Sequence, residues 1–366
     1  MTQCSGDIGD RIERPRRTGS PAFAEDDGGG WGDVPSHDEK AMTSPDLPAE
    51  LKAALEARLK GFSRNDAAER STSISKTYRD GGGSGAIRSE ADALAYALAR
   101  MPATYAAVTA SLNALCVIRP GFAPKRLLDI GAGPGTASWA AAEAFSSLQD
   151  FTLLDANDAL RKLALDLASD SFRLRDAVYE RGEARSLLSK AEAADLVIAS
   201  YMIGEINESE QAALGALMWE KTRDTLLVVE PGTPAGYGRI IALRERLIAA
   251  GAHVAAPCPH DGKCPLQSPD WCHFTQRLQR SRAHKQVKGA ELPFEDEKFA
   301  YVALTREPVA ARASRVLAQP TVTKVEVTAR LCTPTGVKLT RTPRRAKADY
   351  AVARRWRWGD AVSDER

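Results

Sequence analysis

The sequence predicts an α/β fold in which the strands of a mainly parallel sheet alternate with helices. Four short apolar runs have the length and the aliphatic composition of buried strands, and stretches with a helical pattern separate them. A glycine-rich turn follows the first run, at a position where folds of this kind bind nucleotides. The four runs are residues 126–130, 151–155, 194–200 and 225–230.

The glycine-rich turn, Gly131-Ala132-Gly133-Pro134-Gly135, precedes an alanine-rich stretch, residues 136–145, that predicts a helix. Glycine lacks the Cβ atom that keeps a ligand off the backbone, and the first turn of a helix offers unpaired N–H groups. The second run ends in Asp155, 20 residues after Gly135, where a carboxylate can accept hydrogen bonds from ribose hydroxyls. The spacing G-x-G-x-G departs from the G-x-G-x-x-G of dinucleotide sites. The sequence therefore predicts a nucleotide site, with a plain glycine turn as the alternative.

This arrangement resembles the class I methyltransferase fold, in which G-x-G-x-G follows the first strand and an acid ends the second. The resemblance implies S-adenosylmethionine as the cofactor, with the glycines at its methionine and ribose end and Asp155 on the ribose hydroxyls. The residues assigned to the cofactor in this way are Asp129, Gly131, Ala132, Gly133, Gly135 and Asp155.

Three cysteines, Cys258, Cys264 and Cys272, lie in a segment that also holds four prolines and one glycine. These residues disfavour a regular helix or strand and predict a stiff loop whose thiols can converge, as a metal requires. Cys332 lies 60 residues after Cys272, at the end of the strand-like run 322–331. It completes the site if that strand returns beside the loop. An intracellular composition argues against disulfides.

Two kinds of metal centre suit four such thiols, and the residues leave the choice open. Zinc sites usually have cysteines paired two to four residues apart, whereas the gaps here are five and seven residues. Iron–sulfur clusters accept four cysteines with looser spacing. His260 and His273 lie near the cysteines, and a histidine ligand would favour zinc. Thiols without a metal are the third alternative.

A combination of four motifs resembles the Rsm22 family, which comprises bacterial proteins and mitochondrial small-ribosomal-subunit factors, among them the methyltransferase-like protein 17 group. The motifs are AYALARMPATY (95–105), LDIGAGPG (128–135), VEPGTP (229–234) and DWCHF (270–274). The resemblance, which runs from about residue 47 to 332, implies an iron–sulfur 4Fe–4S cluster on Cys258, Cys264, Cys272 and Cys332, with zinc as the alternative. It also implies association with rRNA of the small ribosomal subunit, and thus a role in ribosome biogenesis or translation.

Basic residues gather in two segments, although the formal net charge of the chain is only +2. Residues 338–357 hold eight basic side chains against one acid, close to the rings of Tyr350, Trp356 and Trp358. RNA-binding surfaces typically combine cations that neutralise phosphates with aromatic rings that stack on unpaired bases. A second basic segment lies between residues 273 and 290, and a solvated surface is the alternative for both. The basic residues are Lys338, Arg341, Arg344, Arg345, Lys347, Arg354, Arg355 and Arg357, then Arg277, Arg280, Arg282, His284, Lys285 and Lys288.

Composition divides the chain into four parts. Residues 1–46 hold 10 acids, 5 basic residues, 7 glycines and 4 prolines, and predict a disordered tail. Residues 47–120 predict a helical cap over the nucleotide site, or helices with a packing role, in which two helical stretches meet at Pro102. Residues 121–337 form the methyltransferase-like domain with the cysteine-rich loop at 256–290, and residues 338–366 form a basic C-terminal extension.

Location and assembly follow from what the sequence lacks. No run of 18 consecutive apolar residues occurs, so we expect no membrane span. The N-terminus has no signal-peptide core, and its acids argue against a mitochondrial presequence. The sequence therefore predicts a cytoplasmic protein that is monomeric away from the ribosome.

No catalytic residue stands out. Amine methyltransferases of this fold commonly carry Asn/Asp-Pro-Pro-aromatic after the fourth strand, whereas this chain has SYMIGE (200–205). Cytosine C5 enzymes need a thiolate near that strand end, and no cysteine occurs between Cys116 and Cys258. Two classes of function remain: an S-adenosylmethionine-dependent methyltransferase acting on rRNA or a ribosomal protein, and a non-catalytic assembly factor shaped by its cofactor and cluster.

Overall fold

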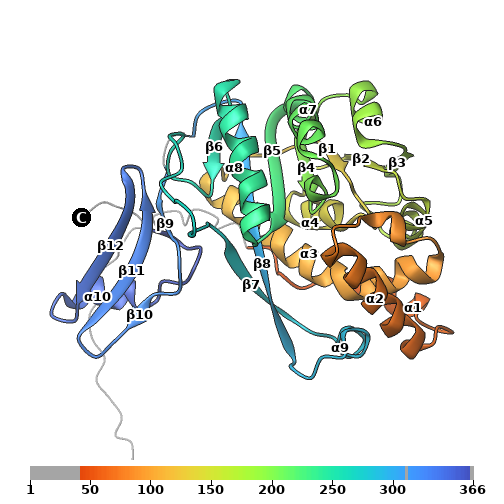
Figure 1. Cartoon of the computed structure of the whole chain (residues 1–366), viewed down its shortest axis with the longest axis horizontal. Coiled ribbons are helices and arrows are strands. Elements are labelled where there is room, and N and C mark those ends of the chain that lie inside the picture. Colours follow the sequence, from red (N-terminus) through yellow and green to blue (C-terminus); the bar gives the residue numbers. More distant parts are fainter. Residues whose placement is uncertain (1–41, 310–311, 363–366) are drawn as a thin grey trace, which may run out of the picture. The chain divides into compact units, whose positions relative to one another are not determined.

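The computed structural model describes residues 42–309 and 312–362 (Figure 1). The predicted disordered tail, residues 1–46, therefore falls almost entirely outside the described residues, as does Cys4. The described part contains two β-sheets, and the larger one carries the predicted nucleotide site.

The larger sheet has eight strands within the described residues. They are β1 Arg126–Ile130, β2 Asp150–Asp155, β3 Val178–Arg181, β4 Ala194–Ser200, β5 Thr222–Pro231, β6 His253–Ala256, β7 Phe274–Gln279 and β8 Phe294–Thr305. The order is β3-β2-β1-β4-β5-β8-β6, with β7 also paired to β8. Strands β1 to β5 are parallel, and β8 is antiparallel to β5, β6 and β7. This is the topology of class I methyltransferases, so the predicted fold class is confirmed.

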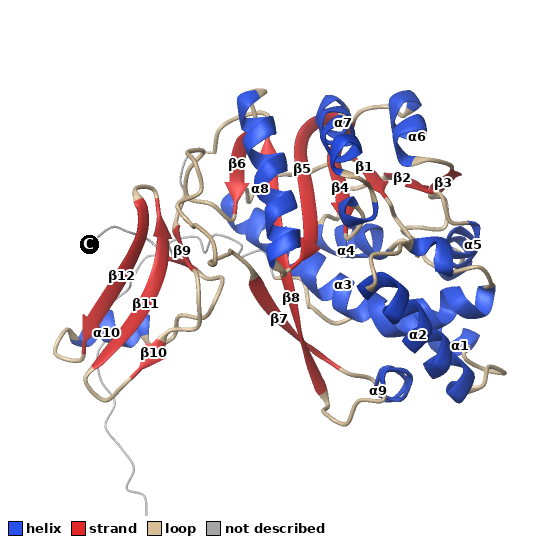
Figure 2. Cartoon of the chain, in the orientation of Figure 1, coloured by secondary structure: helices blue, strands red, loops and turns tan. Residues whose placement is uncertain are grey.

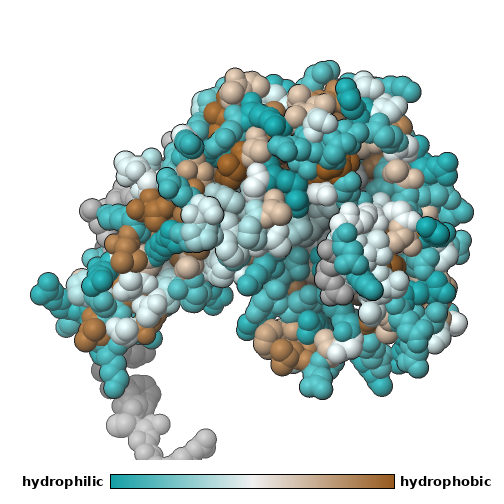
Figure 3. All heavy atoms as spheres, viewed as in Figure 1, coloured by the Kyte–Doolittle hydropathy of each residue, from teal (hydrophilic) through white to brown (hydrophobic). Residues whose placement is uncertain are grey.

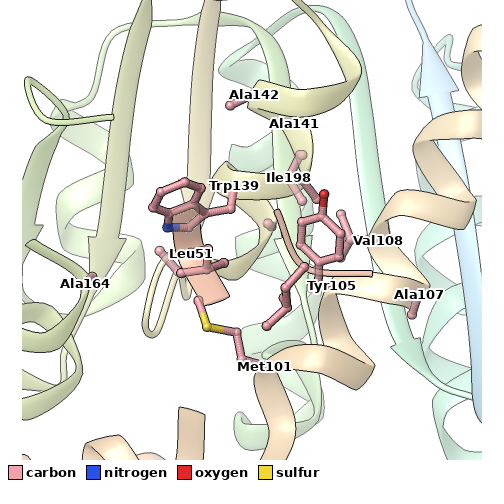
Figure 4. Close-up of a cluster of buried hydrophobic side chains, with 14 of the residues drawn as sticks. Leu51, Met101, Tyr105, Ala107, Val108, Trp139, Ala141, Ala142, Ala164 and Ile198 are labelled. Atoms are coloured by element: carbon pink, nitrogen blue, oxygen red, sulfur yellow. The ribbon is translucent and has the colours of Figure 1, made fainter. Parts of the chain in front are cut away.

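Helices cover both faces of this sheet (Figure 2). One face carries α3 Glu90–Ile118, α4 Thr136–Ala144 and α5 Asp158–Ala168, and the other carries α6 Ala184–Lys190, α7 Glu208–Glu220 and α8 Pro234–Ala249. Successive strand residues point to opposite faces. Leu127 therefore packs in the first core and Leu128 in the second. Figure 4 shows Met101 and Tyr105 of α3 near Trp139 of α4 in the first core.

Helix α3 runs through Pro102 without a break, whereas the sequence predicted two helical stretches that meet there. A proline inside a helix removes one hydrogen bond and costs roughly 3 kcal/mol. Burial offsets this cost, because Leu98, Met101 and Tyr105 around Pro102 are all buried. By length and composition α3 would also pass for a membrane span, but 61% of its apolar window is buried inside the protein, as in a core helix.

Three shorter elements precede α3: α1 Ala49–Arg58, α2 Arg64–Arg79 and the 3-10 turn η1 Ser84–Ala86. Helix α1 buries Leu51 and Leu55, which lie four residues apart on one face of the helix. Helix α2 begins at Ser63, whose side chain accepts a hydrogen bond from the N–H of Asp66. It packs against α3 and against α9 Arg282–Lys288, which connects β7 to β8.

The smaller sheet has five strands within residues 312–362. They are β9 Ser314–Val316, β10 Thr321–Val322, β11 Glu326–Thr333, β12 Gly336–Pro343 and β13 Ala361–Val362, and α10 Lys347–Ala353 follows β12. A turn divides the run 322–331, which the sequence predicted as one strand. The turn forms because the Thr323 hydroxyl accepts hydrogen bonds from the N–H groups of Val325 and Glu326. At its far end β11 carries Cys332, which pairs with β9 on one side and β12 on the other.

Candidate functional site

The glycine turn after β1 adopts a backbone conformation that other residues rarely take. Gly131, Gly133 and Gly135 have φ values of +65°, +53° and +79°, in the left-handed region where only glycine is unstrained. A Cβ atom on Gly131 would lie 2.6 Å from the Cβ of Met202, in the loop after β4. Gly135 is the residue before α4, so the turn leads directly into the first N–H groups of that helix.

Asp155 lies at the end of β2 and points at this turn. One carboxylate oxygen accepts a hydrogen bond from the N–H of Gly133 at 2.9 Å, and the other accepts one from the N–H of Asn157 at 2.7 Å. Burial raises the pKa of Asp155. The structure thus brings the three glycines and Asp155 together at the carboxyl edge of the parallel strands, where ligands of such sheets bind.

Asp129 lies below the turn and is completely buried. One carboxylate oxygen accepts hydrogen bonds from the Ser138 N–H at 3.1 Å and from its hydroxyl at 2.7 Å. The other oxygen has no hydrogen-bond partner among the described residues. Burial raises the pKa of Asp129 to about 7. Asp129 therefore supports the turn from below, whereas the Cβ-free turn and the carboxylate of Asp155 suit a polar cofactor. The residues present fit S-adenosylmethionine.

A strap formed by residues 81–87 joins two strand ends beside the turn, which the sequence did not predict. The Ser84 N–H donates to a carboxylate oxygen of Glu205 at 2.9 Å. The Asn157 amide donates to the carbonyls of Ser84 and Ile87 at 2.8 and 2.9 Å. Gly83 approaches Glu205 so closely that a Cβ atom there would lie 2.5 Å from its carboxylate. The strap therefore packs closely against Glu205 at Gly83.

The second site is a cavity in the cysteine-rich loop, between α8, β8 and the smaller sheet. Cys258, Cys264, Cys272 and Cys332 all line it. Cys332 reaches the cavity because β11 pairs with β9, whose Arg315 donates a hydrogen bond to the carbonyl of Pro257 at 3.2 Å. Arg330 of β11 also pairs with Asp270 of the loop at 2.6 Å. Two hydrogen-bonded contacts thus hold the smaller sheet on the loop.

Positive charge surrounds these thiols inside the protein. Arg244 and Arg315 line the cavity and are 1% and 5% exposed. Arg244 donates to the carbonyls of His260 and Gly262 at 2.7 and 2.9 Å, while its Nε has no partner among the described residues. The Tyr237 hydroxyl lies 3.1 Å from the Sγ of Cys264.

The thiols influence one another. Burial, reinforced by the neighbouring thiols, raises the pKa of Cys272 well above its ordinary value and that of Cys332 to about 12. Arg315 acts on both in the opposite direction. Without a metal Cys272 and Cys332 are therefore neutral thiols at physiological pH. A metal would have to displace their protons on binding, as thiolate sites require.

The donor geometry bears on the kind of metal. No group of three or more His, Cys, Asp or Glu side chains within residues 42–309 and 312–362 converges on the position of a single metal ion. His260 faces the carbonyl of Gly262, and the His273 ring stacks on Trp271 and meets the edge of Trp358. Neither histidine is among the described residues that line the cavity. The four thiols remain its only metal-binding groups within that described lining.

The two predicted basic segments differ in the structure. All eight basic residues of 338–357 are exposed, and none forms an ion pair with another described residue. In the other segment Arg277 pairs with Asp296, and Arg280, His284 and Lys288 surround Glu295. Two acids of β8 therefore contact four of its six basic residues, and Glu295 shares one negative charge among three of them. Figure 3 shows a mainly hydrophilic face with separate apolar patches.

The rings predicted to stack on bases have partners within the protein. The Tyr350 hydroxyl donates to the carbonyl of Thr323 at 2.8 Å, and Trp356 packs on the core of the smaller sheet. Trp358 meets the ring of His273 with a centroid distance of 4.5 Å. The basic surface at 338–357 therefore offers charge, while its aromatic rings serve mainly in packing.

The strand order and the glycine turn define the class of this protein, a chain with the class I methyltransferase fold. A family model described as mitochondrial small ribosomal subunit Rsm22 matches residues 90–363. This match covers most of the chain and includes both the glycine turn and all four cysteines. The chain therefore belongs to the Rsm22 family.

Two curated relatives give this family a context. The human mitochondrial ribosome assembly protein METTL17 is 28% identical over 288 residues, which cover 74% of this chain and 62% of the relative. The Rsm22-cox11 tandem protein 2 of Schizosaccharomyces pombe, also mitochondrial, is 26% identical over 257 residues, 64% of this chain and 33% of the relative. The chain thus spans about three fifths of the first relative and one third of the second.

Solved structures with a similar fold include a magnesium protoporphyrin IX methyltransferase from Synechocystis with bound S-adenosylmethionine. It is 12% identical, has a TM-score of 0.38, and the match covers 63% of this chain and 90% of that one. A proposed RNA methyltransferase from Pyrococcus horikoshii is 12% identical and has a TM-score of 0.34, and the match covers 53% of this chain and 81% of that one. The strand order, rather than these low scores, establishes the fold.

The predicted cytoplasmic location is wrong by these comparisons. The family description and the names of both curated relatives are mitochondrial. The prediction relied on the acidic N-terminal residues, of which 1–41 lie outside the described part of the chain. The fold and its two sites depend on burial and hydrogen bonding, which are the same in either compartment, so no residue in them reports the location.

Proposed function

We propose that this chain binds S-adenosylmethionine and acts in assembly of the small ribosomal subunit. The name of its human relative describes ribosome assembly for that protein, and the family description names the mitochondrial small ribosomal subunit. The observation that carries the proposal is the extent of the Rsm22 match, residues 90–363, because it includes both candidate sites. The bound cofactor would supply an electrophilic methyl group. Because Gly131, Gly133 and Gly135 have no side chains, the cofactor could lie directly against the backbone of the turn. Asp155 would accept hydrogen bonds from the ribose hydroxyls of the cofactor.

We propose that the four cysteines around this cavity bind a 4Fe–4S cluster, with zinc as the alternative. Zinc would need all four sulfurs about 2.3 Å from one ion, and within the described residues no three His, Cys, Asp or Glu side chains are placed to hold a metal ion. A cluster instead takes one thiolate on each of four irons, so its ligands are spread further apart. Four thiolates also bring negative charge into a buried place, and Arg244 and Arg315 would offset part of it.

The cluster would act as a staple between two parts of the fold. Three of its ligands lie in the proline-rich loop, and the fourth, Cys332, lies in the smaller sheet. Binding free energy at such a site is also folding free energy. Loss of the cluster would therefore release the loop and weaken the attachment of the smaller sheet.

We also propose that the chain contacts rRNA through the basic surface, the eight exposed basic residues of 338–357, and is monomeric away from the ribosome. Exposed cations without ion-pair partners can each neutralise a phosphate and release its counterions. The basic surface lies on β12, α10 and the turns beside them, so the smaller sheet would present it in a fixed geometry.

A non-catalytic assembly factor is the second candidate. The observation that favours it is a hydrogen bond of Tyr201, the first residue after β4, whose hydroxyl donates to Glu297 at 2.9 Å. Because this hydroxyl is already bonded to a carboxylate, it is not free to act on a methyl acceptor. No cysteine occurs in the sequence between Cys116 and Cys258, the interval that contains this strand end.

One experiment separates the two candidates. Purified protein is incubated with small ribosomal subunits and methyl-tritiated S-adenosylmethionine, and binding of the cofactor is measured in parallel by calorimetry. Incorporation of tritium that is lost in Gly133→Asp supports the methyltransferase. Cofactor binding without incorporation supports the assembly factor, and absence of cofactor binding refutes the cofactor proposal itself.

A further inference from the structure

A second cavity lies at the carboxyl edge of the larger sheet and belongs to neither site described above. Its volume is about 680 Å³, within the range of roughly 300–1,000 Å³ typical of ligand pockets. Helices α2, α3 and α9 and the loops after β4 and β5 supply its walls. We call it the tyrosine pocket, because Tyr78, Tyr96 and Tyr201 all line it.

The tyrosine pocket is a neighbour of the proposed cofactor site. Tyr201 follows β4 directly, and the next residue, Met202, lies against Gly131 of the glycine turn. Pro231, at the end of the neighbouring strand β5, also lines the pocket. Both residues lie at carboxyl ends of parallel strands, the edge at which open α/β sheets bind their ligands.

The lining has a consistent chemistry. It contains three tyrosines and two cations, Arg100 and Lys288, but no Asp or Glu among the described residues. Glu297 lies 3.7 Å from Arg100, and Glu295 lies 2.5 Å from Lys288; neither acid lines the pocket itself. A lysine or arginine side chain in the pocket would be repelled by Arg100 and Lys288, and no carboxylate of the lining could pair with it. A nucleotide could instead stack its base on the tyrosine rings and place its phosphate near the two cations.

Two of the tyrosines already form a stacking surface. The rings of Tyr78 and Tyr96 have centroids 6.0 Å apart and an interplanar angle of 27°. Stacking on such rings accepts any base, because every base has a π-face. Tyr78 comes from α2 and Tyr96 from α3, so packing between these helices sets the position of the surface.

Tyr201 is held in an unusual conformation. Its φ is +57°, and it is the only residue other than glycine with positive φ among those described. Its N–H donates to the carbonyl of Val229 at 2.8 Å, and its hydroxyl donates to Glu297 at 2.9 Å. Such strain persists where surrounding contacts enforce it, often at ligand sites. Here the contacts fix both the backbone and the ring of Tyr201 at the pocket wall.

We infer that the tyrosine pocket binds a single unpaired nucleobase of RNA, stacked on the tyrosine rings, with Arg100 and Lys288 near its phosphates. This inference rests on the proposed function, since it names the substrate class of the same edge of the sheet. It assigns RNA rather than a protein side chain to the pocket. It requires no methyl transfer, so it applies to both the methyltransferase and the assembly factor.

The test uses the full chain and a short single-stranded RNA that carries one fluorescent pyrrolo-cytosine. Stacking of that base quenches its fluorescence, so a change on adding protein reports entry into an aromatic site. Stacking on an aromatic ring contributes roughly 1–3 kcal/mol per base, so Tyr96→Ala should weaken binding of this probe by about 5- to 150-fold. Tyr96→Phe retains the ring and should bind like the wild type.

Two further variants separate the pocket from the basic surface and from folding. Arg100→Gln should weaken binding of the RNA probe. Arg345→Ala should also lower the affinity for the RNA, but it should not alter the fluorescence of the bound probe. The thermal transition of each variant is measured, and Tyr96→Phe serves as the folded reference if Tyr96→Ala unfolds. Unchanged probe fluorescence in the wild type, or equal quenching in Tyr96→Ala and Tyr96→Phe, overturns the inference. Preferential competition by a lysine-rich peptide also overturns it.

Sedimentation with purified small ribosomal subunits is measured in parallel and reports the proposed function alone. If the wild type sediments with subunits while the probe shows no stacking, the pocket inference fails and the proposed function stands. If the protein does not sediment with subunits, the proposed function fails, and the probe still decides whether the pocket accepts a base.

Discussion

A pair of alanine substitutions in the glycine turn tests the geometry on which the proposed cofactor site depends. Gly131 and Gly133 have similar φ values, +65° and +53°, but different surroundings. A Cβ on Gly133 would have Leu160 as its nearest neighbour, at 3.9 Å, which is an ordinary contact. A Cβ on Gly131 would lie 2.6 Å from the Cβ and 2.8 Å from the Cγ of Met202.

These distances set the expected magnitudes. The left-handed conformation costs a residue other than glycine roughly 1–2 kcal/mol, and both variants bear this cost. Overpacking adds roughly 1–3 kcal/mol in Gly131→Ala alone. Met202 cannot move aside easily, because hydrogen bonds hold the backbone of its neighbours Tyr201 and Ile203. We therefore expect Gly133→Ala to lose about 1–2 kcal/mol of unfolding free energy and Gly131→Ala about 2–5 kcal/mol.

Urea unfolding of the two single variants measures the difference, and a double-mutant cycle assigns its cause. Met202→Gly removes both atoms that the new Cβ would meet. In the Met202→Gly background the extra cost of Gly131→Ala should disappear, while that of Gly133→Ala should remain. Equal losses for the two single variants, or no coupling between positions 131 and 202, would refute the packing argument.

Three further predictions concern other parts of the chain. Cys332→Ser should lose most of the bound iron and lower the thermal transition, whereas the matched control Cys116→Ser, on α3, should leave the iron content unchanged. Burial raises the pKa of Asp129 to about 7, so the folded protein retains a proton that the unfolded chain loses above about pH 4. Wild-type stability should therefore fall relative to Asp129→Asn, by roughly 1.4 kcal/mol per pH unit, as the pH rises through this window. Urea titrations measure that gap, which should stay constant above the folded pKa; a gap that does not widen contradicts the assignment. Arg345→Ala should lower the salt slope of RNA binding by about one phosphate contact, and Arg277→Ala, whose guanidinium already pairs with Asp296, should lower it less.

Local patterns predicted much of the larger sheet and its turn. The run 126–130 became β1 without change, and the glycines, Asp129 and Asp155 lie at one edge of the sheet. Their placement follows from short-range rules, because a buried strand, a glycine turn and a helix occupy consecutive residues. The sequence predicted that the four cysteines would lie near one another, and all four line one cavity; that they hold a metal stays a prediction.

What the sequence did not predict depends on contacts between distant segments. The continuity of α3 through Pro102 comes from burial against the sheet, which outweighs the local signal of a proline. The pairing of Arg280 and Lys288 with Glu295 needs the hairpin of β7 and β8 to be known. Arg244 carries no local signal in the sequence, because only the folded loop brings the carbonyls of residues 260 and 262 to its side chain.

The iron–sulfur cluster that we propose on the four cysteines is tested most directly by anaerobic purification, followed by iron and sulfide analysis and a visible absorption spectrum. We expect a brown protein with about four irons and four sulfides per chain. A colourless protein that contains one zinc per chain, or no metal at all, would contradict the proposal.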